Sequence, residues 1–475
     1  MPMVSRYFQS IAYDKNSSII WHSIFGRPTL VTNELAKTLS KYINDRHRFD
    51  LEDLFGIGCT RNKRTANLIR NLADAHILLM NYDPFVSYDE QEALDIQNIF
   101  IMHNFSQKCK IKSLSLVVSE ECNFRCQYCK RFADSRHSYG EEKIMPLKVA
   151  EASIDGYLEL VRASGFNEAR INFVGGEPLL NWYTIEKLLP YIDACRKRLG
   201  IQIEMEIHTN MSLLTRDISK VLIAHHVKVT SSVDGNRKGN DAVRFTKNMH
   251  GTYGQIMYGF GVMHNQGHPL EGFTMTVTEK NFFDLNTSII DWAEFRKMKE
   301  IRINIDVIDN IKYPIKDIVA RLMKVRKYAK SKGISVVGLW LRPAENLMLM
   351  PEAEDIGFCE GEKGNSLYVM PDGRVLPCKH SKFDLGKYTD IPTIHHNYRY
   401  RELLKRRNLL NFSKCHDCPI LGFCRGGCMV TREANKGKPD KLASMCEFYL
   451  SMTYAILRED LKDQTSPSKT QGDSL

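Results

Sequence analysis

Residues 122–129 read CNFRCQYC and place Cys122, Cys126 and Cys129 directly after the apolar run SLSLVVS. Thiolates are the soft ligands that proteins use for zinc and for iron–sulfur clusters. Three thiolates are one fewer than a structural zinc ion or a complete cluster usually takes. The spacing therefore predicts either a zinc site with a fourth ligand elsewhere, for which His137 is near enough, or a [4Fe–4S] cluster with one open iron.

Composition and length set the broad class of the protein. The chain has 475 residues, of which 43% are hydrophobic and 26% charged, so two or three ordinary globular domains are expected. Its first residues lack the apolar core of a signal peptide, and no apolar run approaches the roughly 20 residues that cross a bilayer. We therefore expect a cytoplasmic protein with no membrane contact, in which clustered cysteines favour metal over disulfides. The net charge of +10 comes without a nucleic-acid motif, so no nucleic-acid partner is expected.

The middle of the chain alternates β-rich runs with helical segments. Six such runs occur, at residues 113–119, 169–177, 202–210, 226–235, 272–279 and 300–309. This alternation predicts an α/β fold with a parallel sheet, curled into a partial (β/α)6 TIM-type barrel over residues 111–335. A functional site is expected where the carboxyl ends of the strands meet.

The flanking regions have different patterns. Residues 1–85 contain short β-rich runs and then about three short helices, with Asn33 as the expected cap of the first helix. This order predicts a winged-helix-like domain. Residues 86–110 are interpreted as a connector, residues 340–450 as a loop-rich, cysteine-rich domain, and the polar residues 462–475 as a disordered tail.

The thiol loop and its position resemble the signature of radical S-adenosylmethionine (radical SAM) enzymes. In this sequence VGGEP (residues 174–178) ends the second strand, as the GGEP motif does in that family, while HTN (208–210) and SVDG (232–235) end the next two. The resemblance implies that the open iron binds S-adenosylmethionine, whose reductive cleavage yields a 5′-deoxyadenosyl radical. It also implies an external electron donor of the flavodoxin or ferredoxin type.

Individual cofactor contacts are implied by the same resemblance. Tyr128 would lie beside adenine, Gly175, Gly176 and Glu177 at the methionine amino group, Asn210 at the ribose, and Ser232, Asp234 and Arg244 at the ribose or carboxylate. Arg244 suits the carboxylate best, because a guanidinium binds it bidentately. Each of these residues could instead serve a turn or ordinary packing. The sequence identifies no general acid or base, and His208 and Asp306 are candidates only because they would face the barrel mouth.

Seven further cysteines follow the barrel, at positions 359, 378, 415, 418, 424, 428 and 446. A zinc ribbon would account for four of them. Their complete spacing, C-x13-G-x4-C and then C-x2-C-x5-C-x3-C and a last cysteine, resembles the SPASM domain, which implies two auxiliary clusters and three [4Fe–4S] clusters in all. By that resemblance Cys415, Cys418, Cys424 and Cys446 bind the outer auxiliary cluster, and Cys359, Cys378 and Cys428 bind the inner one.

The inner cluster has no fourth cysteine in this pattern. We therefore expect an open iron there, able to accept a substrate thiolate, unless Glu352, Glu354 or Asp355 fills the position.

The N-terminal order of strands and helices resembles the peptide-recognition module of ribosomal-peptide maturases. That resemblance implies a leader peptide bound by strand addition to a sheet edge. The expected function is therefore a radical SAM/SPASM peptide maturase that oxidatively crosslinks a ribosomally made precursor peptide through a thioether or carbon–carbon bond. Two alternatives remain, a sulfatase-type maturase that forms formylglycine on a partner protein, and a non-catalytic zinc-binding protein.

Overall fold

The structure is a computed structural model that describes residues 2–45, 49–80, 111–129, 143–305, 312–349, 357–405, 415, 417–437 and 439–465. The expected connector, residues 86–110, lies outside the described residues. The same holds for His137, Asp306, and the carboxylates Glu352, Glu354 and Asp355.

The N-terminal unit has the predicted order of strands and then helices. Its elements are β1 Met3–Val4, β2 Phe8–Ala12, β3 Ser17–His22, β4 Gly26–Thr32, α1 Asn33–Asp45, α2 Leu51–Phe55, α3 Lys63–Asp74 and β5 Leu78–Leu79. The strands β2, β3 and β4 form an antiparallel sheet, and β1 pairs with β5. Ile20, Leu39 and Leu72 are fully buried between this sheet and the helices, which gives the unit its own core.

The start of α1 differs from the expected cap. The Leu35 N–H donates to the Thr32 hydroxyl at 3.2 Å, so Thr32 caps the helix. The Asn33 side chain instead accepts from the Ser18 hydroxyl and donates to the Lys15 carbonyl, which ties the helix start to the β2–β3 turn. The cap prediction was wrong by one residue because the asparagine amide finds tertiary partners.

All six predicted barrel strands are present. They are β6 Ser113–Ser119, β7 Glu168–Gly175, β8 Gln202–His208, β9 Lys228–Thr230, β10 Gly272–Val277 and β11 Glu300–Ile305. Neighbouring strands pair in parallel, and a single parallel bridge between Ser232 and Thr274 joins β9 to β10. Buried side chains alternate along β7 and β8, among them Ile171, Ile203 and Ile207, because one face of the sheet packs on helices.

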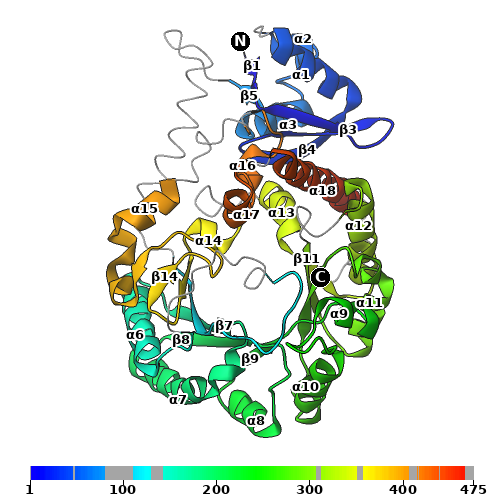
Figure 1. The fold of residues 1–475 in the computed structure, drawn as a ribbon. Coiled ribbons are helices and arrows are strands. Elements are labelled where there is room, and N and C mark those ends of the chain that lie inside the picture. The colour runs from blue at the N-terminus through cyan, green and yellow to red at the C-terminus, as the bar shows by residue number, and fades with distance from the viewer. Residues whose placement is uncertain are drawn as a thin grey trace, which may run out of the picture.

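Helices cover the outside of this curved sheet, as Figure 1 shows. They are α6 Leu147–Ala163, α7 Trp182–Leu199, α8 Arg216–Ala224, α9 Arg237–Val243, α10 Tyr253–Asn265, α11 Thr287–Phe295 and α12 Ile315–Ser331. Short 3-10 turns occur at η1 Pro178–Asn181, η2 Phe282–Asp284, η3 Leu339–Leu341 and η5 Tyr388–His396. The fold is therefore a TIM-like α/β barrel with a mainly parallel sheet, as predicted.

The C-terminal region is more regular than the expected loop-rich domain. Its elements are β12 Ser335–Val337, α13 Arg342–Leu349, α14 Glu360–Lys363, β13 Ser366–Val369, β14 Arg374–Leu376, β15 Gly386–Lys387, α15 Tyr398–Lys405, α16 Leu421–Cys424, α17 Met429–Ala434 and α18 Pro439–Thr465. Strand β13 pairs in parallel with β6, so β13, β14 and β15 extend the barrel sheet. Helix α18 includes the first four residues of the expected disordered tail.

The N-terminal unit packs on this C-terminal region. Trp21 donates from its indole N–H to the Pro419 carbonyl at 2.8 Å, and the Gly422 N–H donates to the Ser23 carbonyl at 2.9 Å. Ile19 and Trp21 share an apolar cluster with residues of α13, α16 and α18. In Figure 1 the blue N-terminal unit accordingly lies against α16 and α18. In the described part of the chain, no helix is both long enough and apolar enough to cross a bilayer.

Candidate functional site

The thiol loop leaves the carboxyl end of β6, where the sequence placed it. Its backbone is fixed on one side by hydrogen bonds from the Arg125 and Gln127 N–H groups to the Phe245 and Val243 carbonyls, at 2.6 and 2.9 Å. Phe124 anchors the loop, with 1% of its side chain exposed. The loop is thus held between the barrel and the strand-like segment before α10, and its thiols keep a fixed orientation.

The three thiols Cys122, Cys126 and Cys129 lie close enough to influence one another. Burial raises the pKa of Cys126 to about 12, with Asp234, Cys129 and Cys122 adding to the effect and Arg244 opposing it. Burial also raises the pKa of Cys122. Without metal, Cys122 and Cys126 therefore stay protonated, and metal binding must displace their protons.

The glycine pair at the end of β7 determines how closely the thiol loop approaches the sheet. A Cβ added at Gly175 would overlap the Ser119 carbonyl, and one at Gly176 would overlap the Glu121 carbonyl. The Gly176 and Glu177 N–H groups donate to these same two carbonyls, both at 2.8 Å. Only glycine lets the backbones meet in this way.

Glu177 lies inside the protein. Its carboxylate is fully buried and accepts from the Leu179 N–H at 3.0 Å, the Thr209 hydroxyl at 2.7 Å and the Asn210 N–H at 2.7 Å. Burial raises the pKa of Glu177 to about 7, although these three donors lower it. The carboxylate links the ends of β7 and β8, and its expected contact with a methionine amino group stays a prediction.

Asn210 joins the same sheet edge to the thiol loop. Its side-chain amide donates to the Asn123 oxygen at 2.9 Å, and its own oxygen accepts from the Ser212 N–H at 3.0 Å. The amide nitrogen also lies 3.9 Å from the Cys122 sulfur. The structure therefore places Asn210 next to Cys122, where a residue of the site is expected.

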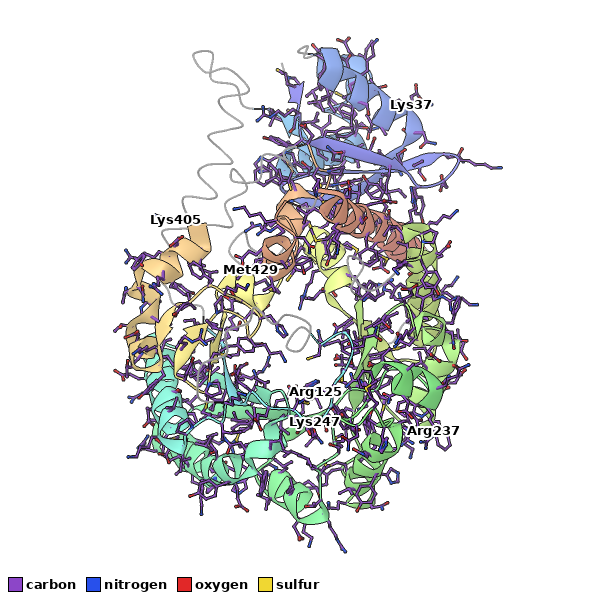
Figure 2. All side chains as sticks on the ribbon, in the orientation of Figure 1. Lys37, Arg125, Arg237, Lys247, Lys405 and Met429 are labelled. Atoms are coloured by element: carbon purple, nitrogen blue, oxygen red, sulfur yellow. The ribbon has the colours of Figure 1, made fainter. Side chains whose placement is uncertain are left out.

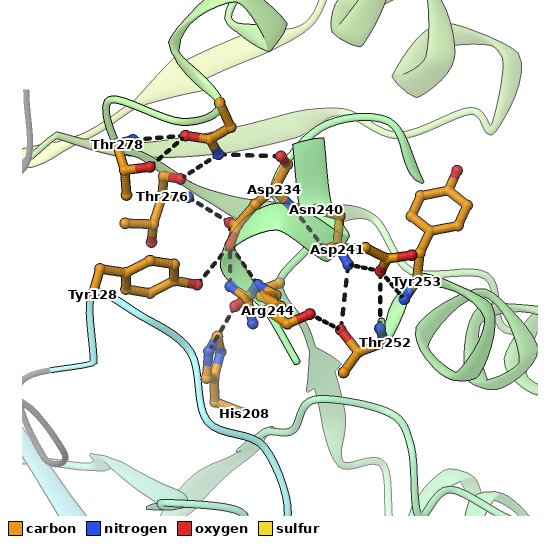
Figure 3. Close-up of polar contacts among 12 residues, drawn as sticks. Tyr128, His208, Asp234, Asn240, Asp241, Arg244, Thr252, Tyr253, Thr276 and Thr278 are labelled. Carbon is orange, nitrogen blue, oxygen red and sulfur yellow. Dashed lines mark hydrogen bonds and ion pairs between the residues drawn. The ribbon is translucent and has the colours of Figure 1, made fainter. Parts of the chain in front are cut away.

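Tyr128, Asp234 and Arg244 form one buried network, shown in Figure 3. Asp234 accepts from the Tyr128 hydroxyl at 2.6 Å, from Arg244 Nε at 2.5 Å and from the Thr276 N–H at 2.7 Å. The Arg244 guanidinium also lies 5.6 Å from the centre of the Tyr128 ring. Burial opposes the charge of Arg244, but Asp234 outweighs burial and raises the Arg244 pKa. The carboxylate that Arg244 binds in this structure is that of Asp234.

Ser232 belongs to a second polar chain that crosses the barrel interior. Its hydroxyl lies 3.2 Å from His208 Nε2, His208 Nδ1 lies 3.1 Å from the Thr230 hydroxyl, and that hydroxyl donates to the Glu206 carboxylate at 3.0 Å. Burial lowers the pKa of His208 to about 3, and the positive charges of Lys379, Arg244 and Arg302 lower it further. His208 is therefore a neutral imidazole at physiological pH.

A pocket of about 260 Å³ opens beside the first cysteine. It is lined by Glu121, Cys122, Asn123, Leu180, Thr246, Lys247 and Asn248. Figure 2 shows Lys247 close to Arg125, which belongs to the thiol loop, within the ring of helices. Positive charge therefore lies beside the loop, on the side where the pocket opens.

Different thiols act on Cys359 and on Cys424, and the expected division of the seven C-terminal cysteines between two clusters stays a prediction. Burial raises the pKa of Cys359 to about 12, with Glu362, Cys428 and Cys378 adding to it. Burial raises the pKa of Cys424 as well, and there the contributing thiols are those of Cys418, Cys446 and Cys415. We call the first set (Cys359, Cys378, Cys428) the inner thiol group and the second (Cys415, Cys418, Cys424, Cys446) the outer thiol group.

Tyr368 connects the inner thiol group to the barrel interior. It lies on β13, which pairs with β6, and burial raises its pKa to about 12 with a further contribution from Cys378. Its hydroxyl is hydrogen-bonded to Ser115 of β6, and Glu206 also acts on it. No sequence pattern predicts this residue, because the strand that carries it is only four residues long.

The donor sets fit iron–sulfur clusters. Within the ranges that the structure describes, no three His, Cys, Asp or Glu side chains gather tightly enough to hold a single metal ion. In a cube-shaped cluster each thiolate binds a different iron, so the sulfurs lie farther apart than around one zinc ion. Grouped but separated thiols, half-buried except for the exposed Cys446, suit the larger group.

A partial parallel barrel with a three-thiol loop after its first strand, a glycine pair after its second and a cysteine-rich region behind it defines a class of iron–sulfur enzymes. The family model of the radical SAM superfamily matches residues 116–289, and that of SPASM, an iron–sulfur cluster-binding domain, matches residues 359–419. The chain is a radical SAM superfamily enzyme with a C-terminal SPASM domain.

Individual relatives agree with this assignment. The chain is 27% identical over 475 residues to the radical SAM cyclopropyl synthase TigE of Paramaledivibacter caminithermalis. The matched region covers 96% of each protein. It is 25% identical over 385 residues to a cysteine-type anaerobic sulfatase-maturating enzyme of Clostridium novyi, covering 72% of this chain and 94% of the relative. The solved structure of native anSMEcpe with bound AdoMet has the same fold, with a TM-score of 0.61, 18% identity, and coverage of 74% of this chain and 99% of that one.

Proposed function

We propose that this chain is a peptide maturase that oxidatively forms a carbon–carbon bond in a ribosomally made precursor peptide. The specific bond proposed is the one that closes a cyclopropane ring. The observation that carries the proposal is the match to the cyclopropyl synthase, which extends over 96% of the chain and so includes the N-terminal unit. The sulfatase-maturating relative covers only 72% of the chain. A thioether remains the alternative bond, and the mass-spectrometry experiment below distinguishes the two.

The proposed cofactors are S-adenosylmethionine and three [4Fe–4S] clusters. Cys122, Cys126 and Cys129 would hold the first cluster, and the inner and outer thiol groups the other two. With its cofactors bound, the site would supply a 5′-deoxyadenosyl radical that removes one hydrogen atom from the substrate, and the auxiliary clusters would supply electron transfer. An external donor of the flavodoxin or ferredoxin type is proposed as the source of the first electron.

The protein's own residues position these groups and exclude water. Gly175 and Gly176 bring the sheet edge against the thiol loop, and Glu177 ties that edge to the next strand. Arg244 is proposed to contact the methionine carboxylate. Asp234 engages its Nε and one terminal nitrogen, and a guanidinium has five donors, so it can serve a second carboxylate. Ser232 and His208 would line the interior in which the substrate carbon sits.

Ring closure removes two hydrogen atoms from the peptide. The first leaves as a hydrogen atom, and the second leaves as a proton together with an electron. Tyr368 lies between the barrel interior and the inner thiol group, so the proposed electron acceptor is adjacent to the place where the substrate radical forms.

The proposed partner is a precursor peptide whose leader adds a strand to β2. In the N-terminal sheet β3 is central, and β4 carries Pro28, which has no N–H to donate. The Tyr13 N–H donates to the Ser17 carbonyl, and the antiparallel ladder repeats every second residue, so the backbone groups of Ser10 point away from β3. Ser10 is also exposed. The Phe8 N–H donates to the Ser5 carbonyl, and the Ala12 carbonyl accepts from Arg458 Nε. A leader strand would therefore pair with β2 at Ser10, between these two occupied groups.

Replacing Ser10 by proline tests this mode of binding. Ser10→Pro removes an outward N–H without removing a hydrogen bond of the β2–β3 ladder, and loss of one such bond weakens binding by about 1 kcal/mol, or roughly fivefold in Kd. Ser10→Ala keeps the N–H and is the matched control. Binding of the fluorescent leader peptide is measured by anisotropy, and equal weakening by both variants would show that the backbone edge is not used.

Mass spectrometry of a small peptide encoded beside the gene, after co-expression, tests the function itself. The expected product lacks two hydrogen atoms, does not react with hydrazide, and keeps every free thiol open to iodoacetamide. Loss of one alkylatable thiol would indicate a thioether instead. An unmodified peptide would contradict the proposal.

A second function is favoured by the match to the sulfatase-maturating enzyme. A maturase of that kind converts cysteine or serine to formylglycine on a partner protein. Its aldehyde would react with hydrazide, so the same co-expression with a sulfatase distinguishes the two functions directly.

A further inference from the structure

Helix α14 begins at the inner thiol group and carries a buried carboxylate. Cys359 occupies the position before its first residue, and Glu362 is the third residue of the helix. Only 2% of Glu362 is exposed. One turn of helix thus fixes a carboxylate and a cluster-binding thiol on the same side of the C-terminal domain.

Helix α14 also packs against a second member of the inner thiol group. A Cβ built on Gly361, the residue before Glu362, would lie 3.5 Å from the Cys378 Cβ. The charge of Glu362 acts on Cys359 together with those of Cys428 and Cys378. Glu362 also acts on Cys424, but there it ranks behind all three other thiols of the outer group.

The position of Glu362 therefore belongs to the inner group. Burial of a carboxylate is costly unless it is paired or bound to a metal. Arg432 Nη2 lies 3.9 Å from Glu362 Oε1 and balances part of its charge. The inner group has three thiols where the outer group has four, and a carboxylate oxygen is an established ligand for iron.

We propose that Glu362 supplies the fourth protein ligand of the inner auxiliary cluster. The proposal rests on the proposed division of the seven cysteines between two clusters. It replaces the open iron expected from the sequence, which considered only carboxylates before Cys359, whereas Glu362 lies after it.

An oxygen ligand has two consequences for the reaction. It changes the electron density at one iron, and ligand type is one of the factors that set a cluster's reduction potential. It also occupies the position at which a substrate thiolate would otherwise bind. The inner cluster would then exchange electrons with the substrate without binding it, which suits a reaction at carbon.

The test uses the full chain with Cys122→Ala, Cys126→Ala and Cys129→Ala, so that only the auxiliary clusters remain. Iron and sulfide are counted after anaerobic reconstitution, and the electron paramagnetic resonance spectrum of the dithionite-reduced protein is recorded with and without 2-mercaptoethanol. The parent protein is expected to hold two clusters whose spectrum does not respond to the thiol. Glu362→Ala should make the inner-cluster signal respond to the thiol or lose one iron, and Glu362→Cys should keep all iron with a shifted spectrum.

Two further variants keep the result interpretable. Glu360→Gln changes a carboxylate of the same helical turn whose side chain is 49% exposed, and it should leave the spectrum unchanged. Glu362→Gln keeps the side-chain shape and replaces Glu362→Ala if that protein does not fold.

Three outcomes would overturn the proposal. If the parent spectrum already responds to thiol, the inner iron is open and the division into two clusters still stands. If Glu362→Ala and Glu362→Gln both match the parent, the ligand is another group. A parent protein with iron for only one cluster would remove the cluster assignment itself.

Discussion

The charged side chains beneath the thiol loop balance one another inside the protein. Arg244 and Asp234 are both almost completely buried and lie 2.5 Å apart, so neither charge depends on solvent. Tyr128 and the Thr276 N–H complete the shell of donors around Asp234. Removing one partner of such a pair leaves an uncompensated buried charge, which costs about 3–5 kcal/mol. At this scale the residues expected to contact the cofactor also stabilise the folded site through one another.

His208 gives a pH-dependent contribution to stability that can be measured. Its pKa is about 3 in the folded protein and about 6.5 when unfolded, so below pH 6.5 the unfolded chain binds a proton that the folded chain does not. The free energy of unfolding should therefore fall as the pH drops from 6.5 towards 3. Relative to a His208→Gln variant, wild-type stability should decrease by about 1.4 kcal/mol for each pH unit.

Urea unfolding between pH 7 and 5.5 checks this expectation for protein with equal cluster content. The exposed His264 provides the matched control, because His264→Gln should give a curve parallel to that of the wild type. Parallel curves for His208→Gln and the wild type would mean that His208 is not held neutral by its surroundings.

The glycine pair acts at the scale of elements, since it sets the distance between the thiol loop and β7. In a Gly176→Ala variant the new Cβ would overlap the Glu121 carbonyl and crowd Cys122. The two segments must then separate, and the hydrogen bonds at 2.8 Å between them should be lost. The variant is expected to fold but to lose most of the iron of the first cluster.

Iron content and the S-adenosylmethionine-induced change in the electron paramagnetic resonance spectrum measure this effect. Gly261→Ala is the control, because Gly261 lies in α10 with no atom near its added Cβ. That change should raise stability by about 0.5–1 kcal/mol through its helix propensity. Full iron content in Gly176→Ala would show that the close approach is not required.

The elements that could be predicted from the sequence are those with a long periodic pattern. Strands such as β6 and β7 were found within one or two residues of their ends, because six runs of similar length alternate with amphipathic helices. Strands β13 and β14 have four and three residues, too few for a pattern, and they are stabilised by pairing with β6. Helix α18 was not predicted, because its first part, which contains Cys446, was interpreted as belonging to the loop-rich domain.

The candidate site shows the same division between local and tertiary signals. The cysteines and the glycine pair could be proposed as site residues because their expected chemistry depends on spacing along the chain. Glu362 and Tyr368 could not, because only tertiary packing brings them to the inner thiol group. The direction of the Glu177 carboxylate was likewise undetermined, since two of its three donors, Thr209 and Asn210, lie far along the chain.

At the scale of the whole molecule, the N-terminal unit and the outer thiol group form one continuous structure. The Gly422 N–H donates to the Ser23 carbonyl, and a Cβ at Gly422 would overlap the Ile24 backbone. Phe423 packs with Trp21 in the shared apolar cluster. The segment that carries Cys418 and Cys424 therefore rests on the unit that is proposed to bind the leader peptide.

Weakening this contact should destabilise the segment that carries the outer thiol group. Trp21 is fully buried, and its indole N–H satisfies the Pro419 carbonyl at 2.8 Å. Trp21→Phe removes that donor and leaves a buried acceptor, at a cost of about 1–3 kcal/mol. If about 1–2 kcal/mol of this cost lowers the free energy of local opening, amide hydrogen exchange in residues 417–424 should become roughly 5- to 30-fold faster.

The control is Trp292→Phe in the barrel helix α11. It removes a tryptophan far from this contact and should leave exchange in residues 417–424 unchanged. Equal exchange in Trp21→Phe and wild-type protein would mean that the outer thiol group is held without help from the N-terminal unit, and that leader binding has no structural route to it through Trp21.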